Sequence, residues 1–174
     1  MRRTAKIINF GVLYGMSAHR LTNELDIPYD EADAFIKTYF ARYPNVQGYI
    51  DKTLTHARQH GYVETLLGRR RYIPDINAKN RNQREYAERT AYNMPIQGAA
   101  ADIMKLAMIA LHPKLAEHGA KLLLQVHDEI IVEAPKDAAE AVSKVMQTTM
   151  QDAYALDVPL VAEVGSGQNW LDAK

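Results

Sequence analysis

The chain contains 174 residues, of which 47% are apolar and 24% charged, and it has ten tyrosines and no cysteine. This composition predicts one globular domain or two small lobes with a packed core, and it excludes an intrinsically disordered chain. Without cysteine there is no disulfide framework and no thiolate metal site. The longest apolar run, residues 98–111, contains Asp102 and Lys105 and is too short to span a bilayer, so no membrane partner is expected.

The two halves of the chain carry opposite charge although the whole chain is neutral. Residues 1–93 contain 15 basic and 10 acidic side chains, and all 11 arginines lie at or before Arg89. Residues 94–174 contain 6 basic and 11 acidic side chains. Arginine suits bidentate contacts to phosphate, and carboxylates suit a hard cation. Two solvated surfaces that differ only in sign would show the same division.

The first part of the chain has a helical pattern and ends at Pro74, where we expect a boundary between two lobes. Apolar side chains three and four residues apart indicate helices, and proline and glycine mark their ends. A β-rich run with Gly68 near its centre indicates a short hairpin. The expected elements are helices over residues 2–14, 28–43 and 44–61 and a hairpin over residues 62–72.

The rest of the chain mixes helical and β-rich patterns. The expected elements are a helix from residue 78 to 111 interrupted at Pro95, a hairpin of residues 121–126 and 130–134, a helix over residues 137–154 and a last strand over residues 159–164. The predicted fold class is therefore α+β. It consists of a helical basic lobe (residues 1–74) and a lobe with a short antiparallel sheet and packed helices (residues 75–174).

Four side chains near the start, Arg2, Lys6, Phe10 and Tyr14, are spaced four residues apart and form one slanted stripe on the predicted helix. Two cations precede two aromatic rings. This order suits a nucleoside triphosphate laid along the helix, with the cations on phosphate oxygens and the rings near sugar and base. A stripe that faces the core, with its cations reaching out to solvent, has the same spacing.

Two further patterns carry polar chemistry. Asp128 and Glu129 lie at the turn of the second hairpin, where adjacent carboxylates can hold Mg²⁺ for two-metal phosphoryl transfer. Acidic residues are also common in ordinary turns. Arg89, Asn93 and Gln97, again four residues apart, can present donors along one helix face, or they can cap the break at Pro95.

Three segments resemble the family A DNA polymerases, the bacterial DNA polymerase I group: residues 2–15, 89–98 and 125–133. The first is similar to the nucleotide-binding helix of that family. The resemblance implies that Arg2 and Lys6 bind the incoming triphosphate, that Phe10 stacks near its sugar and base, and that Tyr14 lies beside the templating base. A phenylalanine at position 10 resembles the family members that discriminate against dideoxynucleotides.

The second segment resembles the helix that follows the primer–template minor groove. It implies DNA contacts for Arg89, Asn93 and Gln97 that check the shape of the duplex without reading its sequence. The third segment resembles the palm hairpin of the same polymerases. It implies that Asp128 is a catalytic metal ligand, that Glu129 is an auxiliary carboxylate and that His127 touches the primer end. The arginines 69–71, including Arg71, are expected to meet backbone phosphate.

The resemblance as a whole implies the C-terminal fingers and palm portion of a cytoplasmic, nucleoid-associated bacterial polymerase. Such an enzyme adds deoxynucleotides from dNTPs to the 3′ end of a DNA primer–template with two Mg²⁺ ions. No residue matches the family's other metal-binding aspartate, which lies upstream on a palm strand. The upstream palm and thumb are therefore expected in cis or on another chain, and we expect the isolated chain to be inactive. Two alternatives are a non-catalytic nucleic-acid-binding module that uses the basic lobe and a metal-dependent phosphohydrolase built on Asp128 and Glu129.

Overall fold

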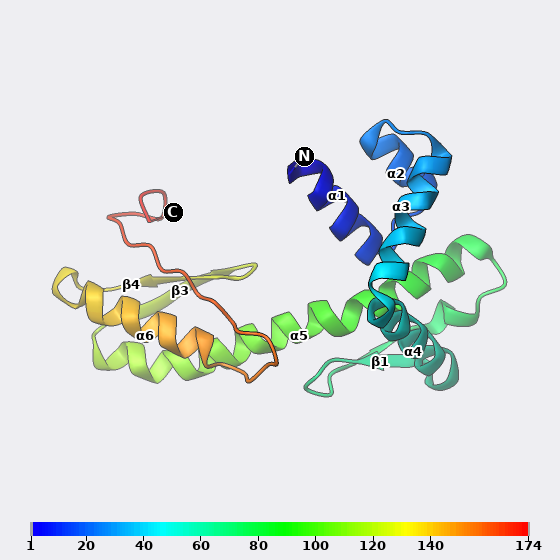
Figure 1. Ribbon diagram of the computed structural model, residues 1–174. Coiled ribbons are helices and arrows are strands. Elements are labelled where there is room, and N and C mark those ends of the chain that lie inside the picture. The colour runs from blue at the N-terminus through cyan, green and yellow to red at the C-terminus, as the bar shows by residue number, and fades with distance from the viewer. Residues whose placement is uncertain (1, 174) are drawn as a thin grey trace. The chain divides into compact units, whose positions relative to one another are not determined.

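A computed structural model of the protein describes residues 2–173, and their side chains from Lys6 onward (Figure 1). The predicted α+β class is confirmed, because most elements are helices and two antiparallel hairpins make the only strands among the described residues. The elements are α1 (Arg2–Leu13), α2 (Ala18–Leu25), α3 (Tyr29–Arg42), α4 (Pro44–His60), β1 (Tyr62–Glu64), β2 (Arg70–Tyr72), a 3₁₀ turn (Pro74–Asn77), α5 (Arg81–Glu117), β3 (Lys121–Val126), β4 (Glu129–Glu133), a second 3₁₀ turn (Lys136–Ala138) and α6 (Ala139–Gln151).

The chain divides into two compact units, Met1–Gly98 and Ala99–Lys174, and α5 belongs to both. This division reflects which residues contact one another most and does not separate functional lobes. The expected functional division after residue 74 stays a prediction.

The first three helices of unit one share a small core. Leu21 and Ala32 are fully buried at its centre, and Ile7, Ile8 and other apolar side chains pack around them. The helix α2 was not predicted from the sequence because it is only eight residues long. Its local signal is Ser17, whose side chain accepts a hydrogen bond from the backbone N–H of Arg20 at 3.4 Å and so caps the helix.

A second core in unit one joins α4, the β1–β2 hairpin and the first half of α5. Val63 on β1 packs there with Ala57 of α4 and Ala91 of α5. One hydrogen bond adds to this packing: the Tyr49 hydroxyl donates to the backbone carbonyl of Tyr92 at 2.8 Å. The predicted hairpin is confirmed, with Gly68 at its turn at a φ of +80°.

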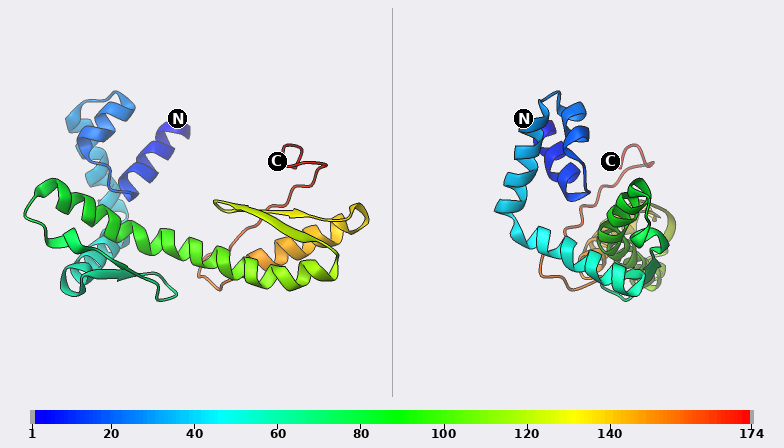
Figure 2. Two further views of the ribbon diagram at one scale, coloured as in Figure 1. Left: turned by 180° about the vertical axis from the view of Figure 1, so that it is seen from behind. Right: turned by 90° about the vertical axis from the view of Figure 1, so that its right-hand side faces the viewer.

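In unit two the β3–β4 hairpin and α6 lie against the last part of α5 (Figures 1 and 2). Leu111 and Leu115 of α5 are buried there, and Val142 of α6 packs with them. The Lys114 ammonium donates a hydrogen bond to the Thr149 hydroxyl at 3.0 Å and links the two helices. The predicted second hairpin and the helix that follows it are confirmed.

Two sequence expectations were wrong. The helix α5 is not interrupted at Pro95 but continues through it from Arg81 to Glu117. Proline removes one N–H from the helix ladder, and here the flanking residues are held by packing, since Ala91, Met94 and Ala99 are all buried. The last strand over residues 159–164 does not form. A strand needs a neighbouring strand for its backbone hydrogen bonds, and among the described residues no strand pairs with this segment. The Gln147 side chain donates a hydrogen bond to its Ala162 carbonyl.

The length of α5 also bears on the expectation that no segment spans a membrane. By length and composition alone, one window of 18 residues in this helix, with a mean hydropathy of 1.3, is long and apolar enough to do so. Its residues Ala107 and Leu111 are instead buried in the core of unit two. In the structure 28% of that window is buried.

Candidate nucleotide and primer–template site

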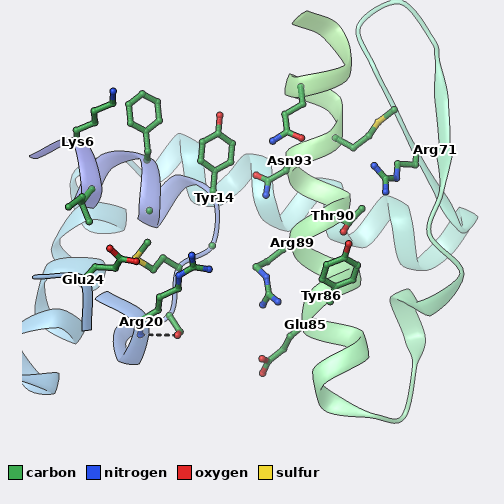
Figure 3. Close-up of a pocket in the computed structure, with 18 residues that line it drawn as sticks. Lys6, Tyr14, Arg20, Glu24, Arg71, Glu85, Tyr86, Arg89, Thr90 and Asn93 are labelled. Carbon is green, nitrogen blue, oxygen red and sulfur yellow. Dashed lines mark hydrogen bonds between the residues drawn. The ribbon is translucent and has the colours of Figure 1, made fainter. Parts of the chain in front are cut away.

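A pocket of about 930 Å³ lies within unit one, among α1, α2, β2 and the first half of α5 (Figure 3). The structure brings together here most of the residues that the sequence singled out for nucleotide or DNA binding. These lining residues are Lys6, Phe10, Tyr14, Arg71, Arg89, Asn93 and Gln97. The side chain of Arg2, which was also predicted to bind nucleotide, lies outside the described residues.

The stripe on α1 faces the pocket and not the core. Phe10 is 50% exposed and Tyr14 39% exposed, whereas Ile7 and Ile8 of the same helix pack on the core of the first three helices. The two rings of the stripe lie nearly parallel, with centroids 6.3 Å apart and planes 11° apart. The alternative of a core-facing stripe is therefore wrong. The rings of Phe10 and Tyr14, with Lys6 one turn before Phe10, are therefore accessible to a ligand in the pocket.

Glycine at position 15 lets the end of α1 approach α5 closely. Its φ is +79°, in the left-handed region that favours glycine. A Cβ atom at this position would stand 1.6 Å from the Tyr92 hydroxyl oxygen and 3.0 Å from Cγ of Arg89. A side chain at this position would force the Tyr92 ring to move. Glycine thus lets the end of α1, next to Tyr14, lie against α5 at Arg89 and Tyr92.

The opposite wall of the pocket is one face of α5. Arg89, Asn93 and Gln97 lie one turn apart on an unbroken helix, so the alternative of capping around a break at Pro95 is wrong. Arg89 and Asn93 project from α5 toward the side on which Lys6 and Tyr14 lie (Figure 3). Both are partly buried, and Gln97 is exposed. Their N–H groups can therefore donate hydrogen bonds to a ligand held between α1 and α5.

The charges around the pocket favour an anion. Lys6, Arg20, Arg71 and Arg89 line it, against only two carboxylates, Glu24 and Glu85. Glu85 is already neutralised, because the Arg81 guanidinium donates a hydrogen bond to it at 2.6 Å. That hydrogen bond is the main cause that lowers the pKa of Glu85.

Sequence reasoning missed part of the lining. Arg20 and Glu24 come from α2, which was not predicted, and the Ser17 cap was the signal that could have revealed that helix. Tyr86 also lines the pocket and is 66% exposed. It lies three residues before Arg89, so the helical repeat places it on the same side of α5.

The acidic hairpin belongs to unit two. Val126 pairs with Glu129, so the turn consists of His127 and Asp128 alone. His127 has a φ of 55°, which costs about 1–2 kcal/mol for a residue with a Cβ atom. The Gln125 side chain donates a hydrogen bond to the His127 carbonyl and braces the turn. Backbone strain of this kind is concentrated at functional sites, where the surrounding structure holds it in place.

The chemistry of Asp128 and Glu129 suits a hard cation, but these two residues provide only part of a metal site. Both are exposed, and within residues 6–173 no hydrogen bond or ion pair engages their carboxylates. Carboxylate oxygens are the ligands that Mg²⁺ prefers. Among the described residues no three His, Asp or Glu side chains gather into a metal cluster. A complete two-metal site therefore needs ligands from elsewhere.

Comparison with known proteins identifies the family. The sequence pattern of "DNA polymerase family A" matches residues 1–172. The thermostable DNA polymerase I of Thermus aquaticus is 61% identical over 174 residues, which cover all of this chain and 21% of that protein. DNA polymerase I of Deinococcus radiodurans is 61% identical over 173 residues, 99% of this chain and 18% of that protein. The chain belongs to DNA polymerase family A.

A solved structure agrees with this assignment. The POL domain of Pol1 from M. smegmatis, in complex with DNA primer–template and dNTP, is 42% identical and superimposes with a TM-score of 0.93. The match covers 99% of this chain and 31% of that one. The chain thus spans about a fifth of the length of the curated relatives that it matches.

Proposed function

We propose that this chain carries the nucleotide-binding pocket and one metal-binding hairpin of a template-directed DNA polymerase, in its C-terminal fingers and palm. The observation that carries the proposal is the pocket between α1 and α5. It gathers cations, stacked rings and helix-face donors in unit one. The M. smegmatis relative, solved with primer–template and dNTP, supports the same assignment.

The stripe on α1 binds the incoming dNTP. Lys6 holds phosphate oxygens through a charge-assisted hydrogen bond, and Arg2 assists it one turn earlier. Phe10 packs against the sugar and base, and Tyr14 lies beside the templating base. The near-parallel rings support this order, because a flat base stacks on an aromatic face with little dependence on its identity.

The face of α5 holds the primer–template. Arg89, Asn93 and Gln97 donate to acceptors in the minor groove, which are similar at every base pair, so binding depends on shape and not on sequence. Arg71 neutralises backbone phosphate near them. In unit two, His127 contacts the primer end.

Asp128, with Glu129 as auxiliary carboxylate, would hold Mg²⁺. Bound there, the ion supplies charge neutralisation at the triphosphate and lowers the pKa of the attacking hydroxyl. The primer 3′ hydroxyl attacks the α-phosphate of the dNTP, and pyrophosphate leaves. The second set of carboxylates comes from palm residues outside these 174, as in a polymerase of full length, so the chain alone does not extend a primer.

Primer extension tests the proposal. The 174-residue chain is assayed alone and together with a polypeptide that carries the upstream palm and thumb of a family A relative. We expect Mg²⁺-dependent extension only in the mixture. Asp128→Asn should abolish it, and Asp137→Asn, a change at an exposed carboxylate of the second 3₁₀ turn, should not.

Two other results would contradict the proposal. Extension by the isolated chain that survives Asp128→Asn would show that the active site has been assigned to the wrong residues. Tight primer–template binding by the mixture without any extension would favour the non-catalytic binding module.

A further inference from the structure

A pair of histidines lies on the last turn of α4, outside the pocket. His56 and His60 are four residues apart, so they share one face of the helix. Their imidazole rings are stacked, with centroids 4.3 Å apart and planes 21° apart. Two histidines at this spacing are a known helical arrangement for binding one transition-metal ion.

The hydrogen bond of His60 leaves the correct nitrogen available for a metal ion. Its Nδ1 lies 3.0 Å from the backbone carbonyl of His56. A carbonyl oxygen can only accept, so Nδ1 carries the hydrogen, and in the neutral ring Nε2 keeps its lone pair. Metal-binding histidines typically donate their other N–H to a backbone carbonyl in this way, which fixes the tautomer and the ring orientation.

The rings can adjust to chelate one ion. His60 is exposed and His56 is only partly buried, and the torsion that turns an imidazole ring is broad. Chelation requires the partly buried His56 ring to turn so that its Nε2 meets the ion held by Nε2 of His60, whose own ring keeps its hydrogen bond. Tyr62 supports both rings from one side, with edge contacts to His56 at 5.3 Å and to His60 at 6.1 Å between centroids.

We propose that His56 and His60 form a bidentate site for a late first-row divalent cation, of the class Cu²⁺, Ni²⁺ and Zn²⁺. Neutral imidazole nitrogen suits these ions and not Mg²⁺, which requires oxygen. Among the described residues no third His, Asp or Glu completes the site, so water fills the remaining positions. The Arg70 guanidinium over the Tyr62 ring, 4.5 Å from its centroid, is paired with Glu64, so it adds no net positive charge beside the site.

The site has a consequence for stability. It links His56 to His60, the final residue of α4, directly before Gly61 and β1. An ion that binds this folded turn and not the unfolded chain stabilises the folded state by mass action. A bound ion therefore stabilises the last turn of α4 where it joins the β1–β2 hairpin.

Titration of the untagged 174-residue chain with Ni²⁺ tests the site by isothermal calorimetry and thermal unfolding. In excess Mg²⁺, which occupies the Asp128 and Glu129 carboxylates, we expect one Ni²⁺ per chain with a rise in Tm. His56→Gln and His60→Gln should each weaken binding by about tenfold or more and abolish the Tm rise. The matched control is His112→Gln, which removes an exposed histidine of α5 and should leave both readouts unchanged. Mg²⁺ in excess should not compete.

Circular dichroism confirms that each variant is folded before titration, so a loss of binding is not a loss of structure. The proposal is overturned if Ni²⁺ binds the His56→Gln and His60→Gln variants as tightly as the unchanged chain, or if the unchanged chain binds no ion. Neither readout involves DNA or nucleotide, so the outcome is independent of the primer-extension assay.

Discussion

Replacing Gly15 by alanine tests how the end of α1 is held against α5. Alanine at a φ of +79° carries a backbone cost of about 1–2 kcal/mol, because its Cβ atom collides with the following carbonyl. The new Cβ atom would also stand 1.6 Å from the Tyr92 hydroxyl oxygen and 2.9 Å from Cζ of the same ring. A forced fit of this kind in a packed region costs about 1–3 kcal/mol more. Gly15→Ala should therefore destabilise the protein by about 2–5 kcal/mol.

Gly61 provides a matched control for the backbone part of this cost. It also follows a helix, its φ is +78°, and no atom lies within 4 Å of the position that a Cβ would take. Gly61→Ala should therefore pay only the backbone cost of about 1–2 kcal/mol. The difference between the two variants isolates the collision with Tyr92.

Urea unfolding followed by far-UV circular dichroism measures both changes as free energies of unfolding. Adding Tyr92→Phe to Gly15→Ala removes the atom at 1.6 Å and should restore part of the stability, which a double-mutant cycle reports as coupling. If Gly15→Ala costs no more than Gly61→Ala, the close docking of α1 on α5 is refuted.

Three further predictions concern the pocket and its support. Phe10→Tyr places a hydroxyl near the sugar and should relax discrimination against dideoxynucleotides in the complemented polymerase; an unchanged ratio of deoxy- to dideoxynucleotide incorporation would refute the placement of Phe10. Tyr49→Phe removes the hydrogen bond to the Tyr92 carbonyl and should cost about 1 kcal/mol in urea unfolding. Because burial raises the pKa of Tyr49, its contribution is complete below the unfolded value near 10 and is lost as pH rises through the folded value, so the variant should lose less stability in alkali. Arg89→Ala should weaken primer–template binding by a similar factor on A·T-rich and G·C-rich duplexes, as measured by fluorescence anisotropy, and a strong dependence on sequence would contradict a shape-reading role.

Local sequence signals predicted most elements of this fold. Pro28, Pro44 and Gly61 bound helices as expected, and the two hairpins follow from β-rich runs around short turns. The errors arose where tertiary contacts, and not the local sequence, determine the secondary structure. Pro95 did not break α5 because packed neighbours hold the helix on both sides. Residues 159–164 have strand-like composition, but no neighbouring strand pairs with them in the described chain.

The same limit applies to the candidate site. The four-residue spacing of Lys6, Phe10 and Tyr14 predicted a shared face, but spacing alone could not show whether that face was buried. The approach of α1 to α5 depends on a single glycine against Tyr92, a contact between residues 77 positions apart in the chain. Arg20 joins the pocket only through the packing of α2, whereas the helical repeat already places Tyr86 on the same side of α5 as Arg89.

The claim that the pocket between α1 and α5 binds the incoming nucleotide is tested most directly by a dNTP titration of the complemented polymerase on a primer–template. Lys6→Ala removes a charge-assisted contact to phosphate worth about 1.5–3 kcal/mol, so the Kd for dNTP should rise about tenfold to a hundredfold. Lys37→Ala is the control, because Lys37 pairs with Asp33 on α3 and does not line the pocket. An unchanged Kd in the Lys6→Ala variant would contradict the assignment of this pocket to the triphosphate.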